Sequence, residues 1–312
     1  MRSLDFKKLY LIIYFVLPVH PLNGIADGGE RNLEIRYKAF FRIKGYGINN
    51  ESQPSAISAS PAGEIFITDK RGNKILKYSA DGNLLYEIGG FGWGNGQFDS
   101  PSDIAVSMGL DIFVTDYNNH RIQRFDRELN FISLLNGENS TGEYMFEFPV
   151  STAVSSTGEI FVVDGARQEV VMLNNEGQVI RKFGKLDYDE PPLKSPTRIE
   201  ISSKDEIVVL DDEGNLIRVY NKFGNYLTTP GKDIFVKLAA IALDNEDNLI
   251  ALDYGAMKLV VFEKFTRPLI TYDLRQIKDL SMPVDISFSK NRIYLLDQNS
   301  PGVFIFERIL YR

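Results

Sequence analysis

A unit that recurs six times along the chain constrains its fold more than any other feature of the sequence. The clearest copy runs from Ser100 to Phe125: an apolar stretch after a proline, a second apolar stretch ending in an aspartate, a polar turn, and an alternating third stretch. The proline positions hold Pro54, Pro101, Pro149, Pro196, Leu238 and Pro283, and the aspartates are Asp69, Asp116, Asp164, Asp211, Asp253 and Asp297. Five copies place the aspartate 15 residues after the proline position, and the sixth places it 14 residues after. This fixed interior indicates a repeated supersecondary unit.

The joints between the units vary in length more than the units themselves. Successive aspartates are 47, 48, 47, 42 and 44 residues apart. Each unit contains three short apolar or alternating stretches, such as Ile104–Val106, Ile112–Asp116 and Arg121–Phe125, and a fourth follows a turn such as Asp81-Gly82-Asn83. No long segment has a helical period. Four short strands at this period predict an all-β fold, a six-bladed β-propeller with four-stranded antiparallel blades.

The two ends of the repeat array complement each other. Residues Tyr37–Ile43 have the pattern of a fourth strand, although no unit precedes them. The sixth unit offers three strands, near Val284–Phe288, Arg292–Leu296 and Val303–Arg308, and has no fourth. We therefore expect the N-terminal strand to complete the last sheet in a 3+1 arrangement, which would close the ring and leave no uncapped end.

The second unit also resembles a known family. Asp116 is followed by Asn118-Asn119-His120-Arg121-Ile122-Gln123-Arg124-Phe125, and the linker Gly94-Asn95-Gly96-Gln97-Phe98 precedes Ser100-Pro101. These residues are similar to the repeat of the NHL family of six-bladed propellers. The resemblance covers Tyr37 to Arg312, is close in the first two units and is degenerate in the last three. It implies the architecture but no particular activity, because one fold hosts many functions.

The N-terminus and the composition indicate where the protein is located. Residues 1–26 combine a basic start, an apolar run from Leu9 to Val19 and a small-x-small site at Gly24–Ala26, which together predict a signal peptide. Residues 27–35 would then form a polar leader and residues 36–312 the propeller, exported to the periplasm or the cell exterior without a membrane span after cleavage. The net charge of -7 disfavours nucleic acid as a partner, and the absence of cysteine excludes disulfides and thiolate chemistry.

Two sets of residues are candidates for a site. The six unit aspartates would form a ring on one face, and we assign them a structural role in which they accept N–H bonds of the turn that follows the second strand. Residues that differ between units are more informative. Two positions after the proline, Asp103, Arg198 and Asp285 introduce charges where the other units carry Ala or Ser, and we expect them at the mouth of the central channel together with Glu200. Trp93, the single tryptophan, is a further candidate contact residue.

These features favour a non-enzymatic binding or scaffold module, expected to be monomeric, that presents loops to a protein, peptide or glycan partner. The longest joints, Asn136–Phe148 and Leu186–Lys194, are expected to contribute to the contact surface. The alternative is a calcium-dependent hydrolase or lactonase with its metal at the channel mouth, and calcium is the one cofactor that the residues leave open. We identify no catalytic residue and no metal-ligand spacing, and of the two histidines, His20 lies in the signal segment and His120 at a turn position. RNA binding, known in NHL proteins, is disfavoured by the acidic charge and the signal peptide.

Overall fold

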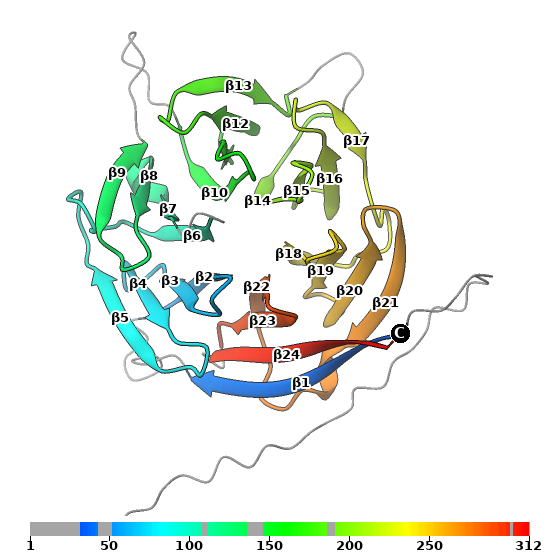
Figure 1. The fold of residues 1–312 in the computed structure, drawn as a ribbon. Helices are drawn as coiled ribbons and strands as arrows, with labels where there is room; N and C mark the ends of the chain where they lie inside the picture. Colours follow the sequence, from blue (N-terminus) through cyan, green and yellow to red (C-terminus); the bar gives the residue numbers. More distant parts are fainter. Residues whose placement is uncertain are drawn as a thin grey trace, which may run out of the picture.

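The computed structural model describes residues 32–42, 52–107, 111–135, 146–185, 191–299 and 302–311. They form six four-stranded antiparallel sheets arranged around a central axis, which confirms the predicted all-β propeller (Figure 1). The signal peptide predicted for residues 1–26 lies outside the described residues. Neither of the two short helical turns in the described part, Tyr117–Asn119 (η1) and Leu274–Gln276 (η2), could span a bilayer.

The first three blades follow each other along the chain, each with its strands in sequence order from the axis outwards. Blade 1 contains β2 (Pro54–Ala59), β3 (Ile65–Asp69), β4 (Lys74–Tyr78) and β5 (Leu84–Gly89). Blade 2 contains β6 (Pro101–Val106), β7 (Ile112–Asp116), β8 (Arg121–Phe125) and β9 (Phe131–Leu135). Blade 3 contains β10 (Pro149–Val154), β11 (Ile160–Asp164), β12 (Glu169–Leu173) and β13 (Val179–Phe183).

The next two blades repeat this order. Blade 4 contains β14 (Pro196–Ile201), β15 (Ile207–Asp211), β16 (Leu216–Tyr220) and β17 (Tyr226–Thr228). Blade 5 contains β18 (Leu238–Leu243), β19 (Leu249–Asp253), β20 (Lys258–Glu263) and β21 (Arg267–Asp273).

The sixth blade takes three strands from the C-terminal end of the chain: β22 (Pro283–Ser289), β23 (Arg292–Asp297) and β24 (Gly302–Tyr311). β1 (Asn32–Arg42) pairs antiparallel with β24, in a register that runs from Asn32 opposite Tyr311 to Arg42 opposite Gly302. β1 begins at Asn32, inside the segment expected to be a leader, and not at Tyr37. The long β24 offers pairing partners to these residues, and Leu33 and Ile35 alternate with polar neighbours, as a strand requires.

The innermost strands also begin earlier than expected. In every blade the strand includes the proline-position residue, which pairs with the unit aspartate, and the register shifts by one residue directly after it. A bulge at this point accommodates proline, which has no N–H to give to the ladder.

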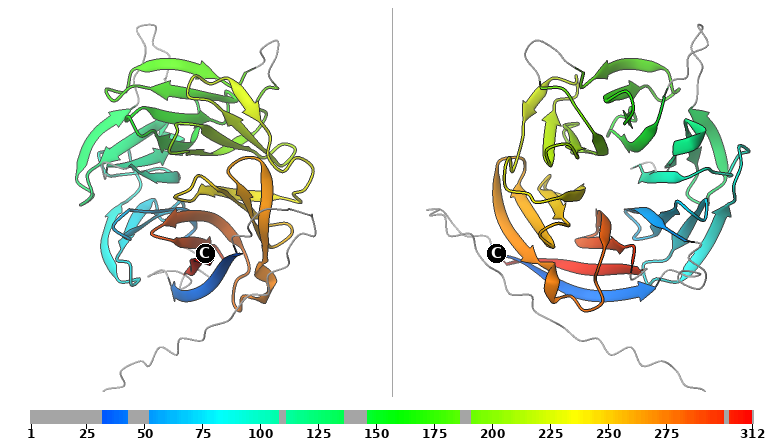
Figure 2. Two further views of the ribbon diagram at one scale, coloured as in Figure 1. Left: turned by 45° about the vertical axis from the view of Figure 1, so that its right-hand side comes forward. Right: turned by 180° about the vertical axis from the view of Figure 1, so that it is seen from behind.

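Strand direction defines two faces of the disc, which is seen obliquely and from behind in Figure 2. The linker face carries the proline-position residues, the unit aspartates and the chain segments that join one blade to the next. The hairpin face, at the other end of the strands, carries the turn between the first and second strands and the turn between the third and fourth strands of each blade.

Burial is greatest in the second strand of each blade and least in the outermost strand. The second strand of every blade is buried, except for the first residue of β23. The outermost strands are much more exposed, as in β13. The apolar clusters lie between neighbouring blades: Ala56, Phe66 and Ile75 of blade 1, for example, pack with Ile104 and Val114 of blade 2. Burial of apolar surface therefore holds each blade to the next and makes the disc a rigid support for its loops.

Candidate functional site

The side chain of Arg198, on β14 in blade 4, crosses the central channel. Its Nη2 donates to the carbonyl oxygen of Ser55 in blade 1 at 3.1 Å, and its Nε lies 3.4 Å from Oδ1 of Asp285 in blade 6. Blades 4 and 1 face each other across the central opening (Figure 1). The guanidinium therefore ties opposite sides of the ring together near the linker face.

The two channel aspartates are held by the blade that follows each of them. Asp103 accepts from the Ser151 hydroxyl at 2.7 Å and from the backbone N–H of Thr152 at 2.8 Å. Asp285 accepts from the backbone N–H of Ile57 at 2.8 Å. Both carboxylates thus satisfy N–H groups on the free edge of the next innermost strand, where an unpaired buried donor would be costly. Of the two aspartates, Asp285 also pairs with Arg198, whereas Asp103 is hydrogen-bonded to Ser151 and Thr152 of blade 3.

The charges in the channel perturb one another. Burial, together with the charges of Asp103 and Asp285, raises the pKa of Glu200 to about 8, although Arg198 opposes the shift. Burial also raises the pKa of Asp285 to about 6, and again Arg198 opposes it. Burial alone would lower the pKa of Arg198, but the two aspartates outweigh it and the net shift is upward. Glu200 is therefore mostly protonated at pH 7.

The channel residues do not suit a divalent cation. Calcium takes six to eight oxygen ligands, mostly carboxylates and carbonyls. Here Asp103 and Asp285 already accept backbone N–H bonds, and the Arg198 guanidinium pairs with Asp285. Within the described ranges, no group of three or more His, Cys, Asp or Glu side chains is placed to hold a metal.

The six unit aspartates link the turn after the second strand to the segment that enters the blade. Asp253 illustrates the arrangement: it accepts from the backbone N–H groups of Val236 and Lys237, both at 2.9 Å, and from that of Ala256 at 3.1 Å. The other five also accept at least one N–H bond from the segment that precedes their innermost strand, namely Asp69, Asp116, Asp164, Asp211 and Asp297. This is more than the turn-capping role expected from the sequence, because the bonds fix the path of the incoming chain as well.

Blade 2 elaborates this arrangement with a buried arginine. Arg121 Nε donates to Oδ2 of Asp116 at 2.7 Å, and the Arg121 side chain is 4% exposed. Its two terminal nitrogens donate to three carbonyl oxygens of the linker, those of Trp93 at 2.6 Å, Gly94 at 3.0 Å and Gln97 at 2.9 Å. Asn119 adds a bond to the Gly92 carbonyl at 2.9 Å. Arg121 and Asn119 therefore hold the backbone of the linker between blades 1 and 2 in place, and the bonds from Arg121 are charge-assisted.

The fixed linker displays two large aromatic side chains. Phe91 is 70% exposed and Trp93 is 65% exposed, the highest values among the large exposed hydrophobic residues of the described chain. Trp93, named from the sequence as a candidate contact residue, therefore lies exposed on a linker, whereas Phe91 was not anticipated. The neighbouring turn adds Tyr117, which stacks on Phe148 at a ring distance of 5.0 Å and carries Lys70 Nζ 5.4 Å from its centroid.

His120 lies in the turn of blade 2 that the sequence indicated. Its φ of 53° places it in the left-handed region, at the end of the short helix η1. Its Nδ1 contacts the carbonyl oxygen of Glu147, and its ring packs on Phe148 at 5.0 Å. These contacts fit the expected turn role.

Most of the joints Asn136–Phe148 and Leu186–Lys194, named as contact surface, lie outside the described residues. Sequence reasoning also missed a cavity on the hairpin face between blades 2 and 3, lined by Asp111 and Arg124 among others.

Comparisons with known proteins agree with this geometry. Residues 98–125 match the model of the NHL repeat. Among curated proteins, the chain is similar to Protein brain tumor of Drosophila melanogaster, with 24% identity over 130 residues that span 41% of this chain and 12% of that protein. The chain therefore matches only a small part of that relative's length.

The solved structures that are similar show the fold alone. Virginiamycin B lyase from Staphylococcus aureus, in a catalytically inactive form with Quinupristin, superposes with a TM-score of 0.62 at 14% identity, covering 88% of this chain and 99% of that one. A protein of unknown function from Bacteroides thetaiotaomicron gives a TM-score of 0.64 at 10% identity, covering 90% of this chain and 77% of that one. By its sheets the chain is a six-bladed β-propeller, and it carries an NHL repeat at residues 98–125, within and just before its second blade.

Proposed function

We propose that this protein is a non-enzymatic binding propeller that uses the linker face around blade 2 to hold a protein, peptide or glycan partner. The observation that carries the proposal is the contrast within one linker: its backbone is fixed by Arg121, while Phe91 and Trp93 remain largely exposed. Exposed aromatic side chains on a rigid support are typical anchors of binding surfaces, because little conformational entropy is lost when they bind.

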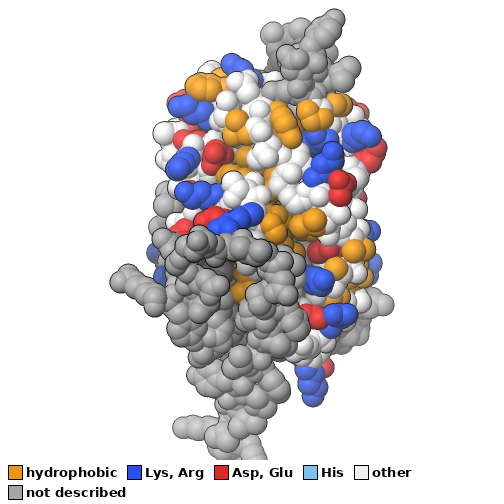
Figure 3. All heavy atoms as spheres, turned by 90° about the vertical axis from the view of Figure 1, so that its right-hand side faces the viewer, with side chains coloured by type: hydrophobic (Ala, Val, Ile, Leu, Met, Phe, Trp, Pro, Cys, Tyr) orange, Lys and Arg blue, Asp and Glu red, His pale blue; other side chains and the backbone are white. Residues whose placement is uncertain are grey.

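The rim of the disc is a weaker candidate. Exposed apolar residues occur there too, among them Leu227 and Leu269 on the outer strands β17 and β21. Figure 3 looks at the rim from the right-hand side of Figure 1, and apolar side chains there are interspersed with Lys, Arg, Asp and Glu. Single apolar residues among charges are normal on a protein surface.

The proposal includes export. The predicted signal peptide of residues 1–26 supports location in the periplasm or outside the cell, and a disc without cysteine does not depend on the redox state of either place. We also propose that the pairing of β1 with β24 closes the ring in solution and covers the long edge of β24, so that the protein is a stable monomer.

Enzymatic activity has no comparable support. The calcium-dependent hydrolase would need carboxylates free to bind metal, but Asp103 accepts bonds from Ser151 and Thr152, and Asp285 is bonded by the Ile57 N–H and by Arg198. The similarity to a lyase is one of fold at 14% identity, and folds of this kind host many activities.

Partner capture with matched variants tests the proposal. The purified protein would be immobilised beside a Phe91→Ala/Trp93→Ala variant and a Leu227→Ala/Leu269→Ala control, which removes exposed apolar area from the rim instead. We expect a partner that wild type and the rim control retain and that the linker variant loses. Equal retention by all three proteins would contradict the proposal.

A further inference from the structure

The turns on the hairpin face repeat from blade to blade, and one set of equivalent residues forms a cluster twice. In blade 1 the cluster consists of Glu64, Phe66 and Lys77, and in blade 2 of Asp111, Phe113 and Arg124 at the same positions of the unit. In blade 1, Lys77 Nζ lies 3.1 Å from Glu64 Oε1 and 5.4 Å from the Phe66 ring centre.

Blade 2 reproduces this arrangement. Arg124 Nε donates to Oδ2 of Asp111 at 2.9 Å, and its Nη2 contacts the same oxygen. The guanidinium carbon lies 5.6 Å from the Phe113 ring centre. Blades 1 and 2 thus each place an acidic side chain, a cationic side chain paired with it and an aromatic ring at the boundary with the next blade.

The two boundaries differ in what the next blade supplies. At the boundary between blades 1 and 2, Arg127 of blade 2 reaches back across the boundary and its Nε donates to Oε2 of Glu64 at 2.7 Å. Lys77 Nζ also donates to the backbone carbonyl of Arg127 at 2.8 Å. Glu64 is therefore bound by two cations, and these bonds hold its pKa below the ordinary value in spite of burial. Arg127, the second of these cations, therefore bridges blades 1 and 2 at this point.

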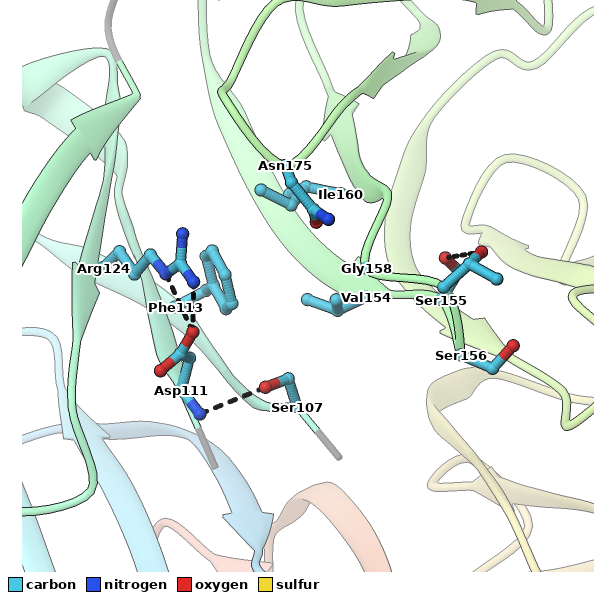
Figure 4. Close-up of a pocket in the computed structure, with 11 residues that line it drawn as sticks. Ser107, Asp111, Phe113, Arg124, Val154, Ser155, Ser156, Gly158, Ile160 and Asn175 are labelled. Carbon is cyan, nitrogen blue, oxygen red and sulfur yellow. Dashed lines mark hydrogen bonds and ion pairs between the residues drawn. The ribbon is translucent and has the colours of Figure 1, made fainter. Parts of the chain in front are cut away.

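At the boundary between blades 2 and 3, the residue equivalent to Arg127 is Asn175. Its short side chain lies over Gly158 of its own blade, where a Cβ would come within 2.3 Å of Asn175 Oδ1. A cavity of about 340 Å³ remains between the blades, with Asp111, Phe113 and Arg124 on one side and Val154, Ser155 and Ser156 on the other (Figure 4). The cavity thus lies at the position that, at the boundary between blades 1 and 2, the Arg127 side chain occupies.

Besides the Arg124 guanidinium, which is paired with Asp111, the hydroxyls on the blade 3 side and the Asp111 carboxylate offer hydrogen-bond acceptors to the cavity. The hydroxyls of Ser155 and Thr157 donate their hydrogens to Glu159, and the Ser156 hydroxyl donates to Asp205, so each can offer only lone pairs to a ligand. Both bonds from Arg124 end on Oδ2 of Asp111, which leaves Oδ1 as an acceptor among the described residues. The Asp111 side chain is 27% exposed. Acceptors around a carboxylate suit a ligand that is cationic and rich in N–H donors.

We propose that the cavity between blades 2 and 3 is a binding site for an arginine side chain of a partner protein, whose guanidinium takes the place that Arg127 fills at the preceding boundary. A guanidinium carries five N–H donors and pairs with carboxylates better than an ammonium does. The acidic net charge of -7 favours the approach of a cationic segment. The site lies on the hairpin face, so it stands apart from the linker-face surface described above and does not depend on it.

The test uses single-residue probes on the whole protein. N-acetyl-L-arginine methylamide would be titrated while the backbone amide resonances of Ser156 and Asn175 are followed by NMR, with the citrulline analogue as a neutral probe of equal shape. We expect saturable shifts with the arginine probe, at a dissociation constant on the order of 1 mM, and none with the citrulline probe. Equal shifts with both probes, or saturation by inorganic phosphate in place of the arginine probe, would overturn the proposal.

Variants turn the comparison between boundaries into a second test. Asn175→Arg supplies the missing cation from within and should abolish probe binding, whereas Asn175→Gln, which is neutral, should keep it. Arg127→Asn should open the preceding boundary and create a second probe site, seen as new shifts in residues around Glu64. If Asn175→Arg still binds the probe as the wild type does, or if Arg127→Asn gains no site while remaining folded, the cavity is not an arginine site.

Discussion

The buried ion pair of blade 2 gives the sharpest test of how the linker is held. Replacing Arg121 by Met keeps most of the apolar volume but leaves the Asp116 carboxylate, which is 0% exposed, without its cation. Removing one partner of a buried pair costs about 3–5 kcal/mol. Asn119 and the backbone N–H of Asp99 still donate to Asp116, at 2.8 Å each, so we expect the lower part of that range, about 3 kcal/mol. At about 2–4 °C per kcal/mol, the Tm should fall by roughly 6–12 °C.

The same position of blade 1 provides the control. Lys74 stands where Arg121 does, but its side chain is 25% exposed and its partner Glu87 is 45% exposed. Exposed pairs contribute about 0–1 kcal/mol, so Lys74→Met should change the Tm by no more than about 4 °C. Two variants of the same kind at equivalent positions should thus differ clearly in urea and thermal unfolding.

The linker itself can be observed through Trp93, the single tryptophan. If Arg121 fixes the linker through its bonds to the Trp93, Gly94 and Gln97 carbonyls, the fluorescence anisotropy of Trp93 should be high in the wild type and fall in Arg121→Met. Lys74→Met should leave it unchanged. An Arg121→Met protein that loses less than about 1 kcal/mol, with unchanged anisotropy, would refute this reasoning.

Three further predictions concern the channel and the ring. The folded protein holds the pKa of Glu200 at about 8, above its ordinary value of 4.5, so ionisation of Glu200 opposes folding. The free energy of unfolding should therefore fall as pH rises from about 4.5 to about 8, by at most about 1.4 kcal/mol per pH unit. Glu200→Gln should flatten this slope in urea titrations between pH 5 and 8 while Glu206→Gln does not, and parallel slopes in all three proteins would exclude the assignment. Removing residues 1–43, which include β1, should lower the Tm and promote association through the freed edge of β24, measured by light scattering. Removing residues 1–31, which leaves β1 in place, should do neither. A protein without β1 that is monomeric and equally stable would argue against ring closure. Addition of 1 mM calcium after chelation should leave the Tm unchanged, because the channel carboxylates are already bonded, and a clear upward shift would revive the calcium-dependent alternative.

Much of the fold could be predicted because the repeat encodes it locally. The constant distance from Pro101 to Asp116 and its equivalents reflects one hairpin, in which these two residues pair across the first and second strands. The residues at which strands begin were predicted less well. The bulge that begins each innermost strand at its proline, and the start of β1 at Asn32, depend on a pairing partner that lies elsewhere in the chain.

The candidate site was predicted only in part, because side-chain reach decides which residues meet. Arg198, Asp103 and Asp285 occupy equivalent positions, but only the long Arg198 side chain crosses the channel, and it meets Asp285 and not Asp103. The exposure of Phe91 and Trp93 follows from how Arg121 holds the linker backbone, which no local pattern reveals. The cavity between blades 2 and 3, in contrast, left a readable signal, since Arg127 and Asn175 occupy the same position of successive units.

The most direct test of the proposed function is hydrogen exchange of the protein alone and in complex with its captured partner. The account predicts that the partner slows exchange in the linker of residues 90–98 and in the turn Tyr117–Asn119, on the linker face of blade 2. Protection confined to the rim strands β17 and β21, with the linker exchanging as in the free protein, would contradict it.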